Sequence, residues 1–126
     1  MRITHVPLLS LLALAGCSKA DAATVDPSSD FDCALTSDFF HEASKIQGAP
    51  DDQRHALFVL NQWYAARWND KHQGDGSKDR ALAIVNAMGK DPNSYKNAIK
   101  ACIDRAVQDP KFNRFAGLMK DVPEPR

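Results

Sequence analysis

The fold is decided by the stretch Asp51–Asp70, which reads DDQRHALFVLNQWYAARWND. At about 100° per residue, its apolar side chains share an arc that covers more than half of a helical wheel. A helix on the surface of a globular protein shows a narrower stripe, so we expect neighbours to cover this helix on several sides. The arc consists of Ala56, Leu57, Val59, Leu60, Trp63, Tyr64, Ala66 and Trp68.

Three side chains of this helix are candidates for contact with a ligand or a partner. Arg67 projects from the middle of the apolar arc. We consider three interpretations of this side chain. In the first, its stem packs while its head reaches solvent or a carboxylate. In the others, it is buried in a pair with an acid, or it binds the anionic group of a ligand. Phe58 points away from the arc and is expected to contact another helix or a partner. Trp68 lies nearest the edge of the arc, so it is the aromatic residue expected to reach the surface.

The start of the chain has the features of an export signal. Met1–Cys17 reads MRITHVPLLSLLALAGC, in which Arg2 precedes an apolar stretch too short to span a bilayer. The segment Leu14–Cys17 (LAGC) resembles the lipobox of bacterial lipoproteins. That resemblance implies cleavage before Cys17 and attachment of diacylglycerol to its sulfur. The alternative is an ordinary secretory signal that is cut near Ala20–Ala23.

Acyl chains on Cys17 would hold the protein at a membrane, because each buried CH₂ contributes about 0.8 kcal/mol and more than one chain anchors durably. Ser18 follows this cysteine. By resemblance to lipoprotein sorting in bacteria with two membranes, it implies the outer membrane, with the domain facing the periplasm. We therefore predict a signal peptide at 1–16, a flexible tether at 17–29, a helical domain at 30–120 and a disordered tail at 121–126.

The charge of the chain gives no electrostatic reason to expect nucleic acid as a partner. Without the leader, 15 basic and 16 acidic residues remain. Eight acidic residues and one lysine lie between Asp21 and Asp52, whereas Lys90–Arg126 carries eight bases and five acids. We expect the acidic part to neutralise the basic part within the fold.

Two of the three cysteines are expected to form a disulfide. If Cys17 carries lipid, Cys33 and Cys102 remain as a pair in an oxidising compartment. A bridge that closes a loop of this length stabilises a domain by about 4 kcal/mol in the chain-entropy treatment. A redox pair is the alternative, but it favours a CxxC-like spacing and a thiolate of low pKa.

The remaining chain reads as further helices. Asp32–Gln47 repeats apolar residues at helical spacing, with Asp30 or Asp32 as its cap. Ser77–Met88 is a second such segment, capped by Ser77 and stopped by Gly89.

After Gly89, two Asp-Pro pairs each give the signal for the start of a helix. Asp91-Pro92 opens a helix with a long apolar stripe. Asp109-Pro110 either begins a short fifth helix or kinks the fourth. Since no run alternates between apolar and polar residues, we predict an all-α fold, a compact bundle of four or five helices with one disulfide. The stripe of the Asp91-Pro92 helix holds Tyr95, Ala98, Ile99, Cys102, Ile103, Ala106 and Val107.

The sequence offers no pattern typical of a metal, a cofactor or catalysis. His41, His55 and His72 lack an HExxH or His/Cys ligand spacing, and His41 and His72 are expected to be solvated. The loop Asp70–Ser77 has aspartates and glycines, but they do not fall at the ligand positions of a calcium loop. We therefore expect no metal, no cofactor and no enzymatic activity.

Several classes of function remain. We predict a non-enzymatic protein-interaction module in the cell envelope, with an envelope protein as its partner. A small periplasmic chaperone or inhibitor is the alternative, by analogy with the small helical acid-stress chaperones of that compartment, which are tied by one disulfide. A third class is contact with glycan or cell wall through exposed aromatic residues. The mature domain also resembles small exported helical proteins without an assigned activity, through its DCA near the start, its aromatic central helix and its late cysteine.

Overall fold

The computed structural model describes residues 24–71 and 78–125. Within these ranges the chain forms five α-helices and one short 3₁₀ helix, with no strand. The prediction of an all-α bundle with four or five helices is confirmed, and Asp109-Pro110 begins a separate helix. The elements are α2 (Asp30–Ile46), α3 (Asp51–Lys71), α4 (Lys78–Lys90), η2 (Pro92–Tyr95), α5 (Lys96–Val107) and α6 (Pro110–Met119).

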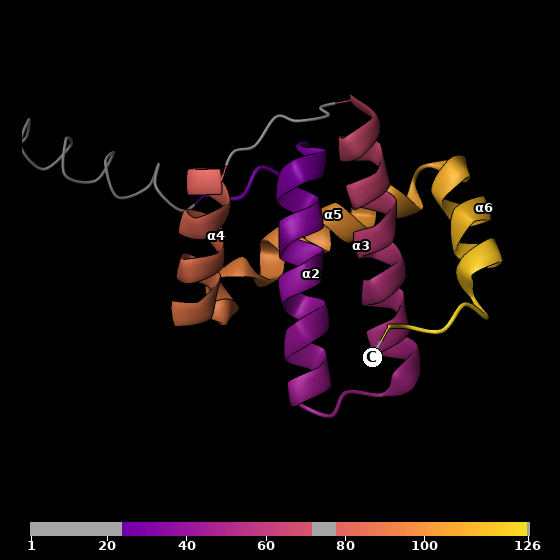
Figure 1. Cartoon of the computed structure of the whole chain (residues 1–126), viewed down its shortest axis with the longest axis horizontal. Helices are drawn as coiled ribbons and strands as arrows, with labels where there is room; N and C mark the ends of the chain where they lie inside the picture. The colour runs from indigo at the N-terminus through magenta and orange to yellow at the C-terminus, as the bar shows by residue number, and fades with distance from the viewer. Residues whose placement is uncertain (1–23, 72–77, 126) are drawn as a thin grey trace, which may run out of the picture.

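The helices are arranged around an antiparallel pair, α2 and α3. In Figure 1, α4, α2, α3 and α6 stand next to one another in that order, and α5 crosses behind α2 and α3. The C-terminal segment after α6 returns towards the start of α3 (Figure 1). No helix in the described ranges is both long enough and apolar enough to cross a bilayer.

A tight corner joins α2 to α3. Gly48 has a φ of +69°, a conformation that glycine adopts without the steric penalty of a side chain. At the other end of α2 the cap is Ser29, whose hydroxyl accepts a hydrogen bond from the Asp32 amide. The expectation of a cap at Asp30 or Asp32 was therefore wrong, because both carboxylates bind arginine side chains instead.

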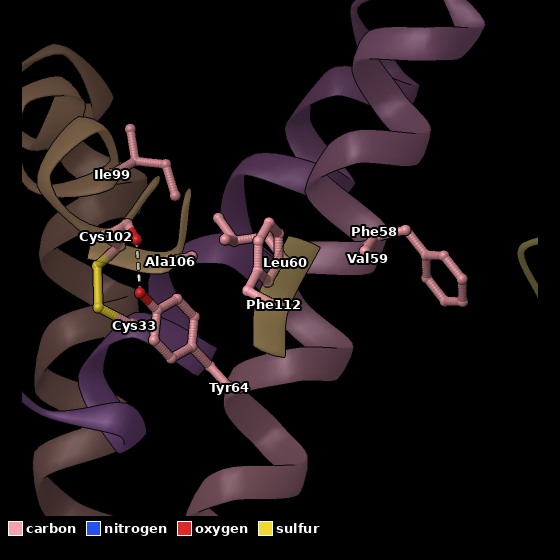
Figure 2. Close-up of a cluster of buried hydrophobic side chains, with 9 residues drawn as sticks. All are labelled: Cys33, Phe58, Val59, Leu60, Tyr64, Ile99, Cys102, Ala106 and Phe112. Carbon is pink, nitrogen blue, oxygen red and sulfur yellow. Dashed lines mark hydrogen bonds between the residues drawn. A yellow bond between two sulfur atoms is a disulfide. The ribbon is translucent and has the colours of Figure 1, made fainter. Parts of the chain in front are cut away.

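The core lies where α2, α3 and α5 meet, and the predicted disulfide links α2 to α5 there. Cys33 on α2 is bonded to Cys102 on α5, with their Cα atoms 5.7 Å apart. Figure 2 shows the Tyr64 hydroxyl of α3 directed at the carbonyl oxygen of Cys102, to which it donates a hydrogen bond. Both sulfurs and the Tyr64 ring are buried. The disulfide is thus placed where the three helices meet.

The buried side chains of α3 do not coincide with the predicted apolar arc, because Phe58, placed outside the arc, is buried as well. Val59, Leu60 and Tyr64 are buried as predicted, but Ala56 and Ala66 are exposed. Both alanines are small, so the exposure of their methyl groups costs little. In addition, α4 runs one residue past Gly89, which was expected to stop it.

Two of the predicted boundaries can be compared with packing. Val25, in the predicted tether, is buried against Ile84 and Met88 of α4. Glu124, in the predicted tail, contacts His41. The fixed part of the chain therefore extends beyond 30–120 on both sides. Cys17 and the signal peptide lie outside the described residues, as do Ser77 and most of the Asp70–Ser77 loop.

Candidate functional site

Arg67 belongs to a buried ionic cluster centred on Asp30. The Asp30 carboxylate accepts hydrogen bonds from Arg105 at 2.7 Å and from Arg67 at 3.4 Å. Burial acts to raise the pKa of Asp30, but the Arg105 hydrogen bond and the charges of both arginines outweigh it, so this pKa lies below its ordinary value. Of the three interpretations of Arg67, the structure shows a half-buried head that reaches a carboxylate.

Both arginines of this cluster also stack on aromatic rings. The Arg105 guanidinium lies 4.8 Å from the centre of the Tyr64 ring, and that of Arg67 lies 5.3 Å from the Trp63 ring. A cation over a ring face is stabilised by the electrons of the ring. These contacts tie α5 and α3 to the N-terminus of α2, which gives the cluster a structural role.

A second buried carboxylate, Asp32, attaches α4 in the same way. Asp32 is 1% exposed and binds both the Nε and the Nη2 atoms of Arg80. Its other contact is the Asp26 amide at 2.8 Å. A bidentate ion pair of this kind fixes the relative orientation of the two side chains better than a single hydrogen bond does. The acid-rich N-terminal part of the chain thus binds basic residues from later helices, of which only Arg105 belongs to the basic stretch Lys90–Arg126.

The histidines His41 and His55 meet at the C-terminal segment. His41 is 6% exposed, and its Nε2 lies 2.6 Å from the carboxylate of Glu124. His55 lies 3.7 Å from the same carboxylate and contacts the Met119 carbonyl oxygen at 2.9 Å. The hydrogen bond with His41 lowers the pKa of Glu124. The expectation of a solvated His41 was wrong, because a residue 83 positions later covers it.

Phe58 lies between these two histidines. Its ring centre is 5.9 Å from that of His41 and 5.7 Å from that of His55, and the side chain is 7% exposed. Of the two expectations for Phe58, contact with another part of the chain is the one that the structure shows. Trp68 is half-buried and packs against Phe31 at the start of α2.

An apolar groove with a volume of about 410 Å³ lies between α3 and α5. Carbon atoms form nearly all of its lining, since most of its residues are aliphatic or aromatic. Volumes of this size are typical of small-molecule sites. The lining residues are Phe40 of α2; Gln53, Ala56, Leu57 and Leu60 of α3; Lys96, Ile99, Ile103 and Val107 of α5; and Phe112 of α6.

The groove leaves one side of α5 uncovered. Ile99 is 8% exposed, whereas Ile103 and Val107 on the same stripe are 37% and 48% exposed. Phe112 of α6 closes one wall and packs edge-on against Trp63. The sequence predicted a long apolar stripe on α5, and this stripe is wider than the neighbouring helices cover.

Phe112 also lines a second hollow of about 400 Å³. It shares Ala56 and Phe112 with the groove, but its lining also includes Asp52, His55 and Lys120. Among the residues that the structure describes, no group of three His, Cys, Asp or Glu side chains is arranged to hold a metal ion.

No family model, curated protein or solved structure matches this chain. Any function assigned to it therefore rests on its own residues. Those residues divide into two sets. The charged and aromatic candidates, including Arg67 and Phe58, bind other parts of the chain. The groove residues Ile103 and Val107, which the sequence placed on an apolar stripe, border an open surface.

Proposed function

We propose that the protein is a non-enzymatic binding module of the cell envelope, exported behind the signal peptide 1–16 and held at a membrane by lipid on Cys17. The observation that carries the binding role is the apolar groove between α3 and α5. Removal of apolar surface from water contributes about 25 cal/mol per Å². The exposed flanks of Ile103 and Val107 therefore give a ligand an interaction that the folded chain does not itself use.

Two features support export. The LAGC segment that ends at Cys17 resembles the lipobox of bacterial lipoproteins. The Cys33–Cys102 disulfide is typical of proteins that fold in an oxidising compartment. An outer-membrane location facing the periplasm follows from Ser18 as a prediction.

The pairing of acids and bases supports a role without catalysis. Asp30, Asp32 and Glu124 are each bound to cationic or histidine side chains from other parts of the chain. These pairs connect helices to one another, and removal of either member would be expected to loosen the fold. We assign them to stability.

The alternative functions draw less support from the geometry. The rings of Trp63 and Trp68 pack against Phe115 and Phe31, so part of each ring is not free for stacking on glycan. A general chaperone exposes apolar surface to many clients, whereas this groove has a defined shape and volume. That the binding partner is an envelope protein stays a prediction.

The test uses the full chain expressed in a bacterium with two membranes. A photo-crosslinking amino acid at position 103 should give one defined adduct, whereas the same amino acid at exposed Leu82 on α4 should give none. Intact mass of the membrane-extracted protein should show lipid on Cys17. A soluble protein with an unmodified Cys17 would refute the anchor, and equal labelling from positions 103 and 82 would refute the groove as the binding surface.

A further inference from the structure

We propose that the groove binds the alkyl chain of a long-chain fatty acid, with the carboxylate of the ligand at Lys96. This inference rests on the proposed binding function and names its ligand. Three observations carry it: the apolar lining, the length of the stripe on α5, and the position of one lysine at its end.

The lining suits a chain without polar groups. An extended peptide would bring backbone N–H and C=O groups that must find partners once they leave water. Among the described residues that form the groove, only Gln53 and Lys96 have polar side chains. An alkyl chain has no such requirement, and it gains free energy with every CH₂ that it buries.

The length of the groove suits a single chain of moderate length. Lys96 and Val107 are both lining residues and stand at the two ends of α5. Eleven steps along an α-helix correspond to about 16 Å. With carbon–carbon bonds of about 1.5 Å in a zigzag, this length accommodates about a dozen carbons. The ligand class is therefore a fatty acid with about twelve to fourteen carbons in contact with the groove.

Charge gives the ligand its orientation. Lys96 is the one charged residue in the described lining, and no carboxylate lies beside it there. It is also the first residue of α5, where the positive end of the helix dipole adds to its charge. A single negative head group at this end leaves the alkyl chain along Ile99, Ile103 and Val107.

The test measures fatty acid binding to the secreted mature chain, residues 17–126 with Cys17→Ala, after removal of bound lipid. Calorimetric titration with saturated fatty acids should give a Kd that falls about fourfold per added CH₂. The gain should end at a chain of about fourteen carbons, where the groove ends. The uncharged alcohol of the same length should bind more weakly than the acid at low salt, and equally at high salt.

Matched variants locate the site. Ile103→Glu places a carboxylate in the groove and should raise the Kd at least about tenfold, and Val107→Glu gives a second, independent disruption. Leu82→Glu, at an exposed apolar position on α4, should bind as the parent does. Lys96→Gln should weaken the acid by roughly two- to fivefold and leave the alcohol unchanged, while Lys78→Gln should change neither.

The outcomes separate the inference from the function on which it rests. Equal binding by the parent, Ile103→Glu and Val107→Glu would overturn the fatty acid site. The same conclusion follows if no fatty acid binds while the crosslinker at position 103 captures one identified envelope protein, a result that leaves the binding module intact. Failure of both experiments overturns both proposals.

Discussion

The two sides of α5 are held in opposite ways. On one side Cys102 is bonded to Cys33, its carbonyl oxygen accepts the Tyr64 hydroxyl, and the side chains are buried. On the other side Ile103 and Val107 border the groove and retain more than a third of their exposure. The same helix therefore fixes the fold with one face and presents an apolar surface with the other. Stability and binding are expected to respond to different substitutions.

The strongest test of this comparison removes the disulfide. The double variant Cys33→Ser/Cys102→Ser opens a loop with a sequence separation of 69. It should lower the free energy of unfolding by about 4 kcal/mol, because the unfolded chain regains the conformations that the bridge denied it. Urea unfolding followed by circular dichroism measures this loss. An unchanged midpoint would mean that the α2 side of α5 does not depend on the bridge.

A matched pair of isoleucines on the groove stripe compares a covered position with an uncovered one. Ile99 and Ile103 lie one turn apart on α5, at 8% and 37% exposure. Ile99→Ala should cost about 3 kcal/mol of stability, since it leaves a cavity. Ile103→Ala should cost about 1 kcal/mol or less, because much of its side chain already faces the groove. Similar losses for both variants, measured by thermal unfolding, would contradict the difference in burial between these two positions.

The ionic cluster on the disulfide side gives a smaller effect. Asp30→Asn removes the charged acceptor of Arg105 and Arg67 and should cost about 2 kcal/mol. The control is Asp104→Asn on the exposed surface of α5, where the pair with Lys100 should be worth about 0.5 kcal/mol or less. If both variants lost the same amount, the cluster would be no stronger than an exposed pair.

The pH dependence of stability follows from the same carboxylate. The folded pKa of Asp30 is lowered, so its stabilisation is complete above the unfolded pKa of about 3.9. It is lost as the pH falls through the lower, folded value. Urea unfolding below about pH 4 should therefore show a shallower acid loss in Asp30→Asn than in the parent. The arginines stay charged throughout this range.

The smallest effect is expected at the C-terminal segment. Glu124→Gln weakens the contact with His41 and should reduce global stability by less than about 1 kcal/mol. The local consequence should be larger, since the segment after α6 loses its charged contact with α2. Hydrogen exchange at residues 120–125 and the ring signals of His41 report it. Asp121→Asn, at an exposed position, is the control and should leave both unchanged.

The parts of the fold that sequence reasoning predicted depend on local patterns. Helical periodicity gave α2 to α6 to within a few residues, and the compartment argument gave Cys33 with Cys102. Asp109 was predicted to start a helix because Pro110 follows it. In the structure its carboxylate accepts a hydrogen bond from the Lys111 amide. The helices and the cap can be predicted from residues that are close in sequence. The disulfide can be predicted because only two cysteines remain to pair once Cys17 is assigned to lipid.

The features that sequence reasoning missed depend on partners far along the chain. Nothing near His41 indicates that Glu124 will cover it, and nothing near Asp30 indicates Arg105. The groove was missed for a related reason. An apolar stripe shows what a helix is able to bury, but only the final packing shows how much of it the neighbours cover. Ile103 and Val107 belong to the apolar stripe of α5, but the neighbouring helices leave them exposed.

The position of the disulfide divides the chain into a closed ring and free arms. The ring runs from Cys33 to Cys102 and contains most of α2, all of α3 and α4, and the first half of α5. The helix α6 lies wholly outside this ring and packs on α3 through contacts such as that of Phe112 with Trp63. Because Phe112 of α6 lines both hollows, a movement of α6 would change the shape of both without breaking any covalent link.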